Sequence, residues 1–385
     1  MLDTTRQAGG DPGWLDVPLG HNAVRFDRRP DGTMTVTPTQ ALAAWPDRLT
    51  DRLAHWAQTT PDRVYMARRD AAGRWRRITY REALSHARAI ASALVGRRLS
   101  PERPVAIVSG NDLDHAMLAL GCLYAGVPYA PISPAYSTLS RDHSKLRYIM
   151  ARLTPGLVFA ADPQIYGAAV DAAVADGTEV VWGRDAEAAK GTPFSALLDT
   201  PAGSAADAAH AAVGPDTIAK FLYTSGSTGN PKGVITTQRM LCSNQAMLLQ
   251  SLAFMRDDPP ELVDWLPWNH VFGGSHNVGL VLYNGGTLHI DDGKPTPVGI
   301  EETVRNLREI APSVYFNVPK GFEELIPFLR DDDPLREKFF SRLKLLFFAG
   351  AGISPVVWQA LEDLSVRTIG RRVPILTGLC ATETA

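Results

Sequence analysis

Residues 223–233 read Tyr-Thr-Ser-Gly-Ser-Thr-Gly-Asn-Pro-Lys-Gly, and the run that precedes them, Ile218 to Tyr223, is typical of a buried strand. Hydroxyl side chains and backbone amides wrap phosphate oxygens, and glycine allows the close backbone approach that this wrapping needs. Lys232 adds a point charge. Because ligands of α/β proteins bind at strand ends, the loop predicts a phosphate site at the edge of a sheet.

Two commoner phosphate loops are excluded by spacing. A Walker A loop needs a second Gly followed by Lys five positions after the first Gly, but the positions five after Gly226 and Gly229 hold Pro231 and Val234. The dinucleotide pattern Gly-x-Gly-x-x-Gly is also absent, because no glycine lies two positions after Gly226. The plainer alternative, a flexible Gly/Ser surface loop, is disfavoured by the ordered ending Pro-Lys-Gly.

Composition places the chain among globular α/β proteins. Its 385 residues are 45% hydrophobic, which is enough for one large domain or two smaller ones. A net charge of −2 gives no sign of a nucleic-acid partner or an anionic membrane surface. No apolar run approaches the ~20 residues of a membrane span, and the first residues lack a secretory signal, so we expect a cytoplasmic location. Cys122, Cys242 and Cys380 lack metal spacing and are expected to be buried free thiols.

Strands and helices alternate along the whole chain. A strand at 105–108, a helix at 111–123 with Asn111 as its N-cap, and a strand at 127–132 predict a parallel pair with a right-handed crossover. Thr79 and Glu82 predict a capping box before the helix 80–95. This alternation indicates a mostly parallel sheet covered on both faces.

Composition also suggests a domain order. We expect an irregular arm at 1–45, a first α/β subdomain at 46–200, a surface linker rich in Ala, Gly, Ser and Pro at 201–216, and a second α/β subdomain at 217–385.

The loop at 223–233 resembles the signature of the adenylate-forming, AMP-binding superfamily, which includes acyl-CoA synthetases, luciferases and peptide-synthetase adenylation domains. The stretch 266–277, Leu-Pro-Trp-Asn-His-Val-Phe-Gly-Gly-Ser-His-Asn, looks most like feruloyl-CoA synthases, as do 282–295, 109–112 and 128–136. The resemblance runs from about Pro46 to Ala385. It implies the N-terminal domain of that superfamily, with two stacked, mostly parallel αβαβα subdomains.

Residues 266–277 combine polar groups with Trp268 and Phe272 just past a predicted strand. Apolar walls with a few orienting polar groups suit a flat aromatic acid. The resemblance implies that His270 flanks the carboxylate, that Phe272 lines the acid pocket and that His276 meets a ring hydroxyl; Asn317 is assigned to the same pocket. Plain packing of His276 in the core stays open as the alternative.

Two later strand ends carry the other predicted contacts. The resemblance implies that Gly350, Ala351 and Gly352 form a wall between adenine and the acid, with Gly350 and Gly378 shared by both pockets. It further implies that Thr382 contacts the α-phosphate and that Glu383 holds Mg²⁺. The predicted nucleotide-binding residues are Thr224, Ser225, Gly226, Ser227, Thr228, Gly229, Lys232, Gly350, Ala351, Gly352, Gly378, Leu379 and Thr382, and the predicted catalytic residues are Thr228, Lys232, His270 and Glu383. The superfamily commonly has Gly-Tyr-Gly before Thr-Glu, and Leu379 here cannot stack as Tyr does.

The expected function is an acid–CoA ligase that uses ATP, Mg²⁺ and coenzyme A to activate ferulate or a related hydroxycinnamate. The resemblance also places a ribose-binding aspartate and a small domain with a catalytic lysine after Glu383. The expectation is therefore that this chain is the large N-terminal domain without the C-terminal catalytic domain, with little full turnover. Two alternatives stay open: a binding module for ATP or acyl-adenylate, and a ligase for benzoate or a medium-chain fatty acid. The sequence does not indicate an oligomeric state.

Overall fold

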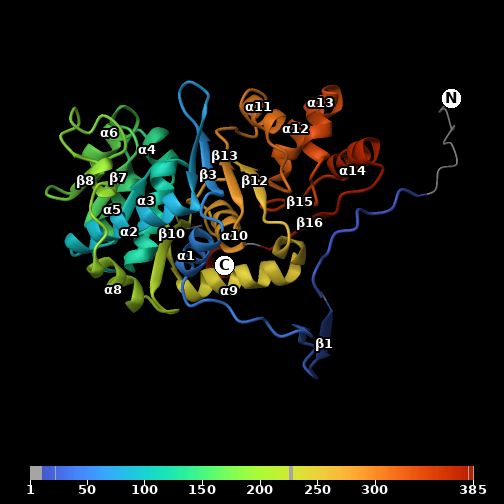
Figure 1. Cartoon of the computed structure of the whole chain (residues 1–385), viewed down its shortest axis with the longest axis horizontal. Helices are drawn as coiled ribbons and strands as arrows, with labels where there is room; N and C mark the ends of the chain where they lie inside the picture. Colours follow the sequence, from blue (N-terminus) through green and yellow to red (C-terminus); the bar gives the residue numbers. More distant parts are fainter. Residues whose placement is uncertain (1–10, 22, 225–228, 380, 385) are drawn as a thin grey trace. The chain divides into compact units, whose positions relative to one another are not determined.

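The computed structural model describes residues 11–21, 23–224, 229–379 and 381–384. Strands and helices alternate along the chain (Figure 1), which confirms the expected α/β class. The chain divides into two compact units. Unit 1 comprises the described parts of Met1–Pro18, Pro260–Trp265 and Asp291–Leu379, and unit 2 those of Leu19–Pro259, Leu266–Ile290 and Cys380–Ala385.

Unit 2 is built on a seven-stranded sheet of order β11-β10-β6-β5-β7-β8-β9. Parallel pairs run from β10 to β9, and β11 joins the edge antiparallel to β10. Strand β5 lies between β6 and β7, so the crossovers run to both sides of it. The strands are β5 (Val105–Val108), β6 (Tyr129–Pro131), β7 (Leu157–Ala160), β8 (Glu179–Trp182), β9 (Thr192–Pro193), β10 (Ile218–Thr224) and β11 (Lys232–Thr237).

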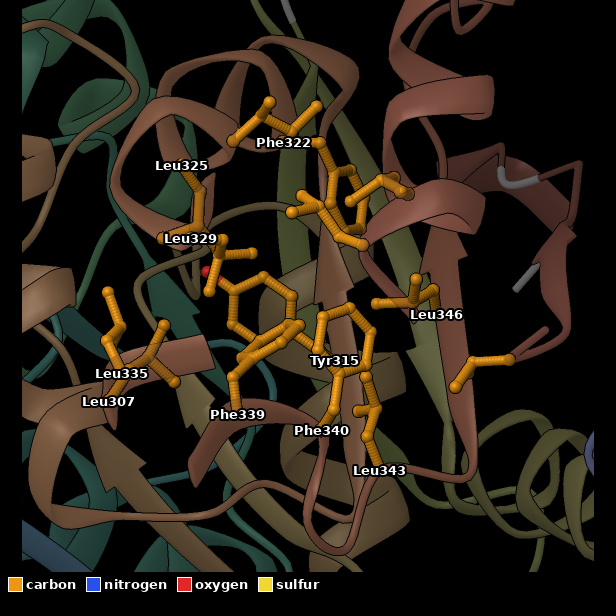
Figure 2. Packing of buried hydrophobic residues seen from close by; sticks show 14 of the residues in the cluster. Leu307, Tyr315, Phe322, Leu325, Leu329, Leu335, Phe339, Phe340, Leu343 and Leu346 are labelled. Carbon is orange, nitrogen blue, oxygen red and sulfur yellow. The ribbon is translucent and has the colours of Figure 1, made fainter. Parts of the chain in front are cut away.

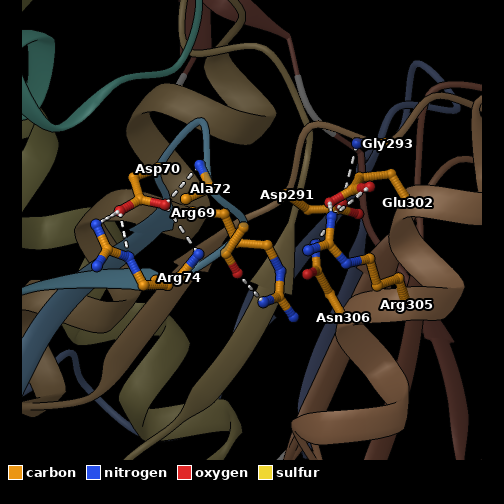
Figure 3. Close-up of polar contacts among 10 residues, drawn as sticks. Arg69, Asp70, Ala72, Arg74, Asp291, Gly293, Glu302, Arg305 and Asn306 are labelled. Atoms are coloured by element: carbon orange, nitrogen blue, oxygen red, sulfur yellow. Dashed lines mark hydrogen bonds and ion pairs between the residues drawn. The ribbon is translucent and has the colours of Figure 1, made fainter.

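Further strands of unit 2 pair outside the seven-stranded sheet. Strand β13 (Thr287–Ile290) runs parallel to β3 (Val64–Arg69), which forms a hairpin with β4 (Trp75–Thr79). Asp70 closes that hairpin by accepting the backbone N–H groups of Ala72 and Arg74 and the Arg74 guanidinium (Figure 3). The hydrogen bond from the Arg74 backbone is the main reason why the pKa of Asp70 is lowered.

The helices of unit 2 follow its strands. They are α1 (Thr50–Thr59), α2 (Tyr80–Gly96), α3 (Leu113–Ala125), α4 (Ala135–Thr138), α5 (Ser144–Leu153), α6 (Pro163–Ala173), α7 (Ser195–Leu198), α8 (Ser204–Ala212), α9 (Gln238–Ser251) and α10 (Val278–Asn284), with the short η1 (Ala253–Arg256), η2 (Phe272–Asn277) and η3 (Thr382–Thr384). The capping box of α2 is confirmed: the Glu82 N–H donates to Thr79 Oγ1 at 3.3 Å, and the Thr79 N–H donates to Glu82 Oε2 at 2.7 Å.

The N-cap expected at Asn111 was wrong. Asp112 caps α3 by accepting the Asp114 N–H at 2.9 Å. Asn111 instead binds the segment 266–277: its Nδ2 donates to the Leu266 carbonyl, and its Oδ1 accepts a hydrogen bond from the Trp268 N–H.

Three expectations about the chain's organisation need correction. The arm 1–45 is not irregular throughout, since β1 (Val24–Arg28) pairs with β2 (Met34–Pro38). The stretch 201–216 contains α8, as its alanine content favours, and does not separate two sheets, because β10 pairs with β6. Unit 2 accordingly continues through residue 259 instead of ending near 200.

Helix α8 is docked through Asp207 and through His210, whose carbonyl accepts a hydrogen bond from Arg48 at 2.8 Å and whose ring stacks on Tyr124. Arg88 of α2 donates twice to Asp207, at 3.0 and 2.6 Å, and the Tyr124 hydroxyl of α3 donates at 2.9 Å. A sequence without bulky anchors therefore still docks on the unit.

Unit 1 centres on a three-stranded parallel sheet of β14 (Val314–Asn317), β15 (Leu345–Phe348) and β16 (Ile375–Thr377). Its aromatic core places Tyr315 and Phe339 with ring centroids 5.2 Å apart, and Phe339 and Phe340 5.0 Å apart (Figure 2). The remaining elements are β12 (Glu261–Asp264), α11 (Ile300–Glu309), α12 (Pro319–Asp331), α13 (Asp333–Phe340) and α14 (Pro355–Ile369).

A buried carboxylate, Asp291, stabilises the start of the stretch Asp291–Leu379 of unit 1. Asp291 accepts the Gly293 N–H at 2.9 Å and the Asn306 amide at 3.0 Å (Figure 3). It also accepts a hydrogen bond from the Thr303 hydroxyl. Burial nevertheless raises the pKa of Asp291. A Cβ at Gly293 would lie 1.9 Å from Thr303 Oγ1, so glycine is required at that turn.

Cys122 and Cys242 are buried free thiols, as expected, and burial raises the pKa of both. Cys380 lies outside the described residues. In the ranges that the structure describes, no helix is both long and apolar enough to cross a membrane.

Candidate functional site

The predicted site residues fall in both units. Unit 2 holds Thr224, Gly229, Lys232, His270, Phe272, His276, Thr382 and Glu383, and unit 1 holds Asn317, Gly350, Ala351, Gly352, Gly378 and Leu379. Ser225, Gly226, Ser227 and Thr228 lie outside the described residues. The roles of all these residues remain predictions, and each group is described within its own unit.

The two ends of the predicted phosphate loop form the base of a hairpin. Strands β10 and β11 pair antiparallel with Thr224 opposite Lys232 and Tyr223 opposite Gly233. Gly229 has φ +101°, a conformation that other residues rarely adopt, and a Cβ there would meet nothing within 4 Å. The pairing therefore brings the Thr224 hydroxyl and the exposed Lys232 together at the strand end.

The segment η3 lies against β11, the strand that carries Lys232. Thr382 is half-buried and Glu383 is exposed. Among the residues that the structure describes, no group of three or more His, Cys, Asp or Glu side chains could hold a metal ion. A single exposed carboxylate fits Mg²⁺, which usually keeps several waters and takes one or two protein carboxylates.

In unit 1, Asn317, Gly350 and Gly378 gather at one edge of the sheet. The parallel register places Asn317 beside Phe348, and Phe348 beside Thr377, whose hydroxyl donates to the Phe348 carbonyl at 2.8 Å. Gly350 has φ +86°, and the nearest atom to a Cβ there would be Val318 Cγ1 at 3.6 Å.

This edge is open and has few internal contacts. Residues 350–352 are exposed, a Cβ at Gly352 would meet nothing within 4 Å, and Leu379 is 100% exposed. An open, glycine-lined backbone suits a planar ring that lies on it.

Asn317 differs from its neighbours because its polar atoms have partners inside unit 1. Its Nδ2 donates to the Tyr315 hydroxyl at 3.1 Å, and its Oδ1 accepts the Val318 N–H at 2.8 Å. These bonds hold the turn from β14 into α12. A contact between Asn317 and an acid stays a prediction.

The segment 266–277 folds back tightly on itself and ends in the π-helix η2. A Cβ at Gly273 would lie 2.4 Å from the Leu266 carbonyl oxygen, and one at Gly274 would lie 2.0 Å from the Trp268 carbonyl oxygen. Two successive glycines are thus a steric requirement of this turn. π-helical turns are frequent at functional sites.

Within this segment His270 is exposed, whereas Phe272 and His276 are buried. The rings of Phe272 and His276 meet edge to face, with centroids 5.5 Å apart and planes at 71°. Burial lowers the pKa of His276 to about 4, against the opposing hydrogen bond with Asn277 Oδ1 at 2.8 Å. The imidazole is therefore neutral at pH 7, and the segment presents an aromatic ring beside an uncharged polar ring.

The sequence analysis missed Lys220. This side chain of β10 is 1% exposed, and its Nζ donates to the Gly274 carbonyl at 2.9 Å. Burial lowers the pKa of Lys220 to about 7. The available signal was a lysine inside an otherwise apolar strand, which calls for an internal partner.

Comparisons with known proteins identify the family of this chain. The model of the family described as AMP-binding enzyme matches residues 53–385. Indigoidine synthase of Streptomyces lavendulae is 30% identical over 225 residues, which are 58% of this chain and 16% of that protein. A methyl-dioxo-octahydro-indenyl propanoyl:CoA ligase of Rhodococcus jostii (strain RHA1) is 24% identical over 327 residues, covering 80% of this chain and 60% of that protein. The chain thus spans less than two thirds of the length of either relative.

A solved structure shows the same fold. A benzoate CoA ligase from Burkholderia xenovorans LB400 superposes with a TM-score of 0.66 at 21% identity, over 88% of this chain and 61% of that one. Because the family match covers most of the residues, including both ends of the phosphate loop and the segment 266–277, the chain belongs to the AMP-binding family of adenylate-forming enzymes.

Proposed function

We propose that this chain binds ATP and a hydroxycinnamate such as ferulate, and that it is part of a feruloyl-CoA synthase type of acid–thiol ligase working in the cytoplasm with Mg²⁺ and coenzyme A. The observation that carries the proposal is the edge-to-face pair of Phe272 and the neutral His276 on a glycine-folded turn. An apolar ring wall beside an uncharged hydrogen-bonding group suits an aromatic ring with a hydroxyl substituent.

The reaction would proceed in two balanced steps. A carboxylate oxygen of the acid attacks the α-phosphorus of ATP, the bond to the β-phosphate oxygen breaks, and pyrophosphate leaves. The thiol sulfur of coenzyme A then attacks the acyl carbon, loses its proton and displaces AMP. The first step brings two anions together, and Mg²⁺ when bound supplies charge neutralisation for it.

The residues at the base of the phosphate loop would serve that first step. Lys232 would guide the phosphates as a mobile point charge, Thr224 would donate a hydroxyl beside it, and Glu383 would hold the hydrated metal ion. His270, exposed at the start of the turn, would orient the carboxylate. Gly350 and Gly378 would leave room for the planar groups.

The neutral state of His276 favours a hydroxylated ring over a second carboxylate. An anion buried against an uncharged imidazole and a phenyl ring would lose its hydration without a compensating charge. A hydroxyl group instead exchanges hydrogen bonds with the imidazole without any charge to neutralise.

ATP–pyrophosphate exchange by the whole ligase of which this chain is proposed to be part, across ferulate, p-coumarate, caffeate, cinnamate, benzoate and medium-chain fatty acids, tests this function. Binding of a non-hydrolysable feruloyl-adenylate analogue to this chain, measured by calorimetry, is the companion assay. We expect the hydroxycinnamates to be preferred and the analogue to bind more tightly than ATP. A strong preference for a fatty acid would overturn the aromatic assignment, and binding without any exchange would favour a binding module.

The variant His276→Leu tests the role of the ring hydroxyl. We expect about a ten-fold weaker response to ferulate but not to cinnamate, because only ferulate carries the hydroxyl that the imidazole contacts. The same substitution at His86, a histidine of α2 outside this segment, is the control. An equal loss for ferulate and cinnamate would show that His276 only packs the core.

A further inference from the structure

Lys220 occupies an unusual place for a lysine. It lies in the middle of β10, where the parallel register pairs it with Tyr129 of β6. Phe221 and Tyr223 pack against the core on one side of the sheet, so the alternation of side chains directs Lys220 to the other side. An ammonium group without a partner is costly to bury in this setting, and a specific contact is needed to keep it there.

That contact is the carbonyl of Gly274. Lys220 Nζ donates to it at 2.9 Å and lies 5.9 Å from the centroid of the Tyr129 ring. Gly274 is separated by one residue from each of the two rings, because Gly273 lies between it and Phe272, and Ser275 lies between it and His276. The lysine therefore holds the centre of the turn whose two ends carry the proposed acid-binding rings.

The two sides of this turn face different surroundings. Gly274, Ser275, Val278 and Gly279 line a cavity of about 40 Å³ together with Lys220, whereas neither Phe272 nor His276 lines it. Lys220 thus contacts the turn on the side of this cavity, where neither ring lies. It supports the rings without sharing their surface.

The cavity is lined mainly by apolar residues, with a few polar side chains among them. Ser275 Oγ and Trp268 Nε1 are buried there and have no hydrogen-bond partner. A cavity of this size has room for a water molecule. We expect this cavity to accommodate the longer side chain of arginine, so Lys220→Arg is the conservative variant for the experiment.

A second support acts on the same turn. Gln245 of α9 donates through Nε2 to the Ser275 carbonyl at 3.1 Å and to the His276 carbonyl at 3.3 Å. Three successive carbonyls, those of Gly274, Ser275 and His276, are thus held by buried side chains of two different elements. Such redundancy indicates that the orientation of this turn matters.

We propose that Lys220 is a positioning residue for acid recognition: its ammonium group fixes the Gly274 carbonyl and thereby the placement of Phe272 and His276. The role in recognition rests on the proposed function. Lys220 also lies four residues before Thr224 on the same strand, so it ties the acid-binding turn to the strand that enters the phosphate loop.

The test compares Lys220→Met, Lys220→Arg and Val158→Ala. Methionine keeps the length of the side chain but removes the donor, arginine keeps a cationic donor, and Val158→Ala removes buried volume from β7, away from the turn. Calorimetry measures the Kd of ATP and of the feruloyl-adenylate analogue for each variant. Hydrogen–deuterium exchange measures the amides of residues 270–277 without any ligand.

We expect Lys220→Met to weaken binding of the analogue by about ten-fold or more, which is the loss typical of a hydrogen bond to a charged group. The Kd of ATP should stay within about two-fold of the wild-type value. Exchange at 270–277 should rise in this variant. Lys220→Arg should restore most of the analogue binding and most of the protection from exchange at 270–277. Val158→Ala should lower thermal stability without changing analogue binding or this exchange.

Two outcomes overturn the proposal. One is that residues 270–277 exchange in Lys220→Met at the same rate as in the wild type. The other is that binding of ATP and binding of the analogue weaken equally in all three variants. If Lys220→Met does not fold, Lys220→Arg carries the test, and a loss of analogue binding there with ATP binding intact contradicts the expected rescue. Failure of the proposed function looks different, because the wild type would then not bind the analogue, while the exchange experiment still reports whether Lys220 positions the turn.

Discussion

The glycines of the β15–α14 turn in unit 1 and those of η2 in unit 2 serve opposite purposes. Gly352 faces open space and a Cβ at Gly350 would make only an ordinary contact with Val318, whereas Gly273 and Gly274 are pressed against backbone carbonyls. The first pair leaves a surface clear, and the second pair lets the chain fold back so that Phe272 and His276 take their places. The same residue type thus marks a surface for contact in one unit and a rigid support in the other.

The largest expected effect breaks this comparison directly. Gly274→Ala would place a Cβ 2.0 Å from the Trp268 carbonyl oxygen, a backbone atom that cannot move aside cheaply. We expect a loss of about 3 kcal/mol in the free energy of unfolding and loss of acid binding. Gly352→Ala is the matched control, since its Cβ meets nothing, and it should stay within about 0.5 kcal/mol. Urea unfolding of both variants measures the difference, and equal destabilisation would contradict the account.

The next largest effect is expected from acid pH, which should change the stability of the two units in opposite directions. All nine histidines fall in the ranges of unit 2, and burial lowers the pKa of both His115 and His276 to about 4. The unfolded chain takes up these protons near pH 6.5, so the stability they contribute is lost as pH falls from about 6.5 towards 4. Each histidine accounts for about 2 kcal/mol at pH 5.

Unit 1 should respond in the opposite direction. Burial raises the pKa of Asp291, so its folded form takes up a proton more readily than its unfolded form, and acid stabilises this part of unit 1. Hydrogen–deuterium exchange at pH 7 and pH 5, corrected for intrinsic rates, checks both signs. A larger rise in the opening of unit 1 than in the opening of unit 2, from pH 7 to pH 5, would contradict the prediction.

A smaller effect is expected at the open edge. Gly350→Ala has space for its Cβ, but φ +86° strains any other residue by about 1 kcal/mol. We expect a loss of stability of that size and a few-fold weaker binding of ATP. Calorimetry with ATP and with the acid alone measures where the loss falls. An unchanged Kd for ATP would remove Gly350 from the nucleotide site.

The smallest effect sharpens the comparison. Leu379 is 100% exposed, and it stands where the resemblance to the superfamily led us to expect a stacking tyrosine. Leu379→Tyr should leave stability within about 0.5 kcal/mol and tighten ATP binding by two-fold to five-fold. Weaker binding of ATP to this variant would show that Leu379 does not lie near adenine.

Much of the fold was predictable because its signals are local. The capping box at Thr79 and Glu82, the strand at 105–108 and the alternation along the chain depend on neighbouring residues only. The N-cap of α3 was misplaced by one residue, because Asn111 and Asp112 are both good caps and only the distant carbonyl of Leu266 decides between them. Helix α8 was missed because the contacts that dock it join distant residues, such as Arg88 and Asp207, which are 119 positions apart.

The candidate site divides in the same way. Its motifs, the loop at 223–233 and the turn at 266–277, stand out in sequence. Lys220 did not, because its partner Gly274 lies 54 positions later and a carbonyl acceptor leaves no trace in the side-chain pattern. Positioning contacts of this kind become visible only when the fold places them.

A crystal structure with a bound feruloyl-adenylate analogue tests the central claim most directly. The account predicts that the ring lies against Phe272, with its hydroxyl in hydrogen-bond range of His276, and that the Lys220–Gly274 bond is retained behind the turn. A ring bound away from Phe272 and His276 would contradict the account.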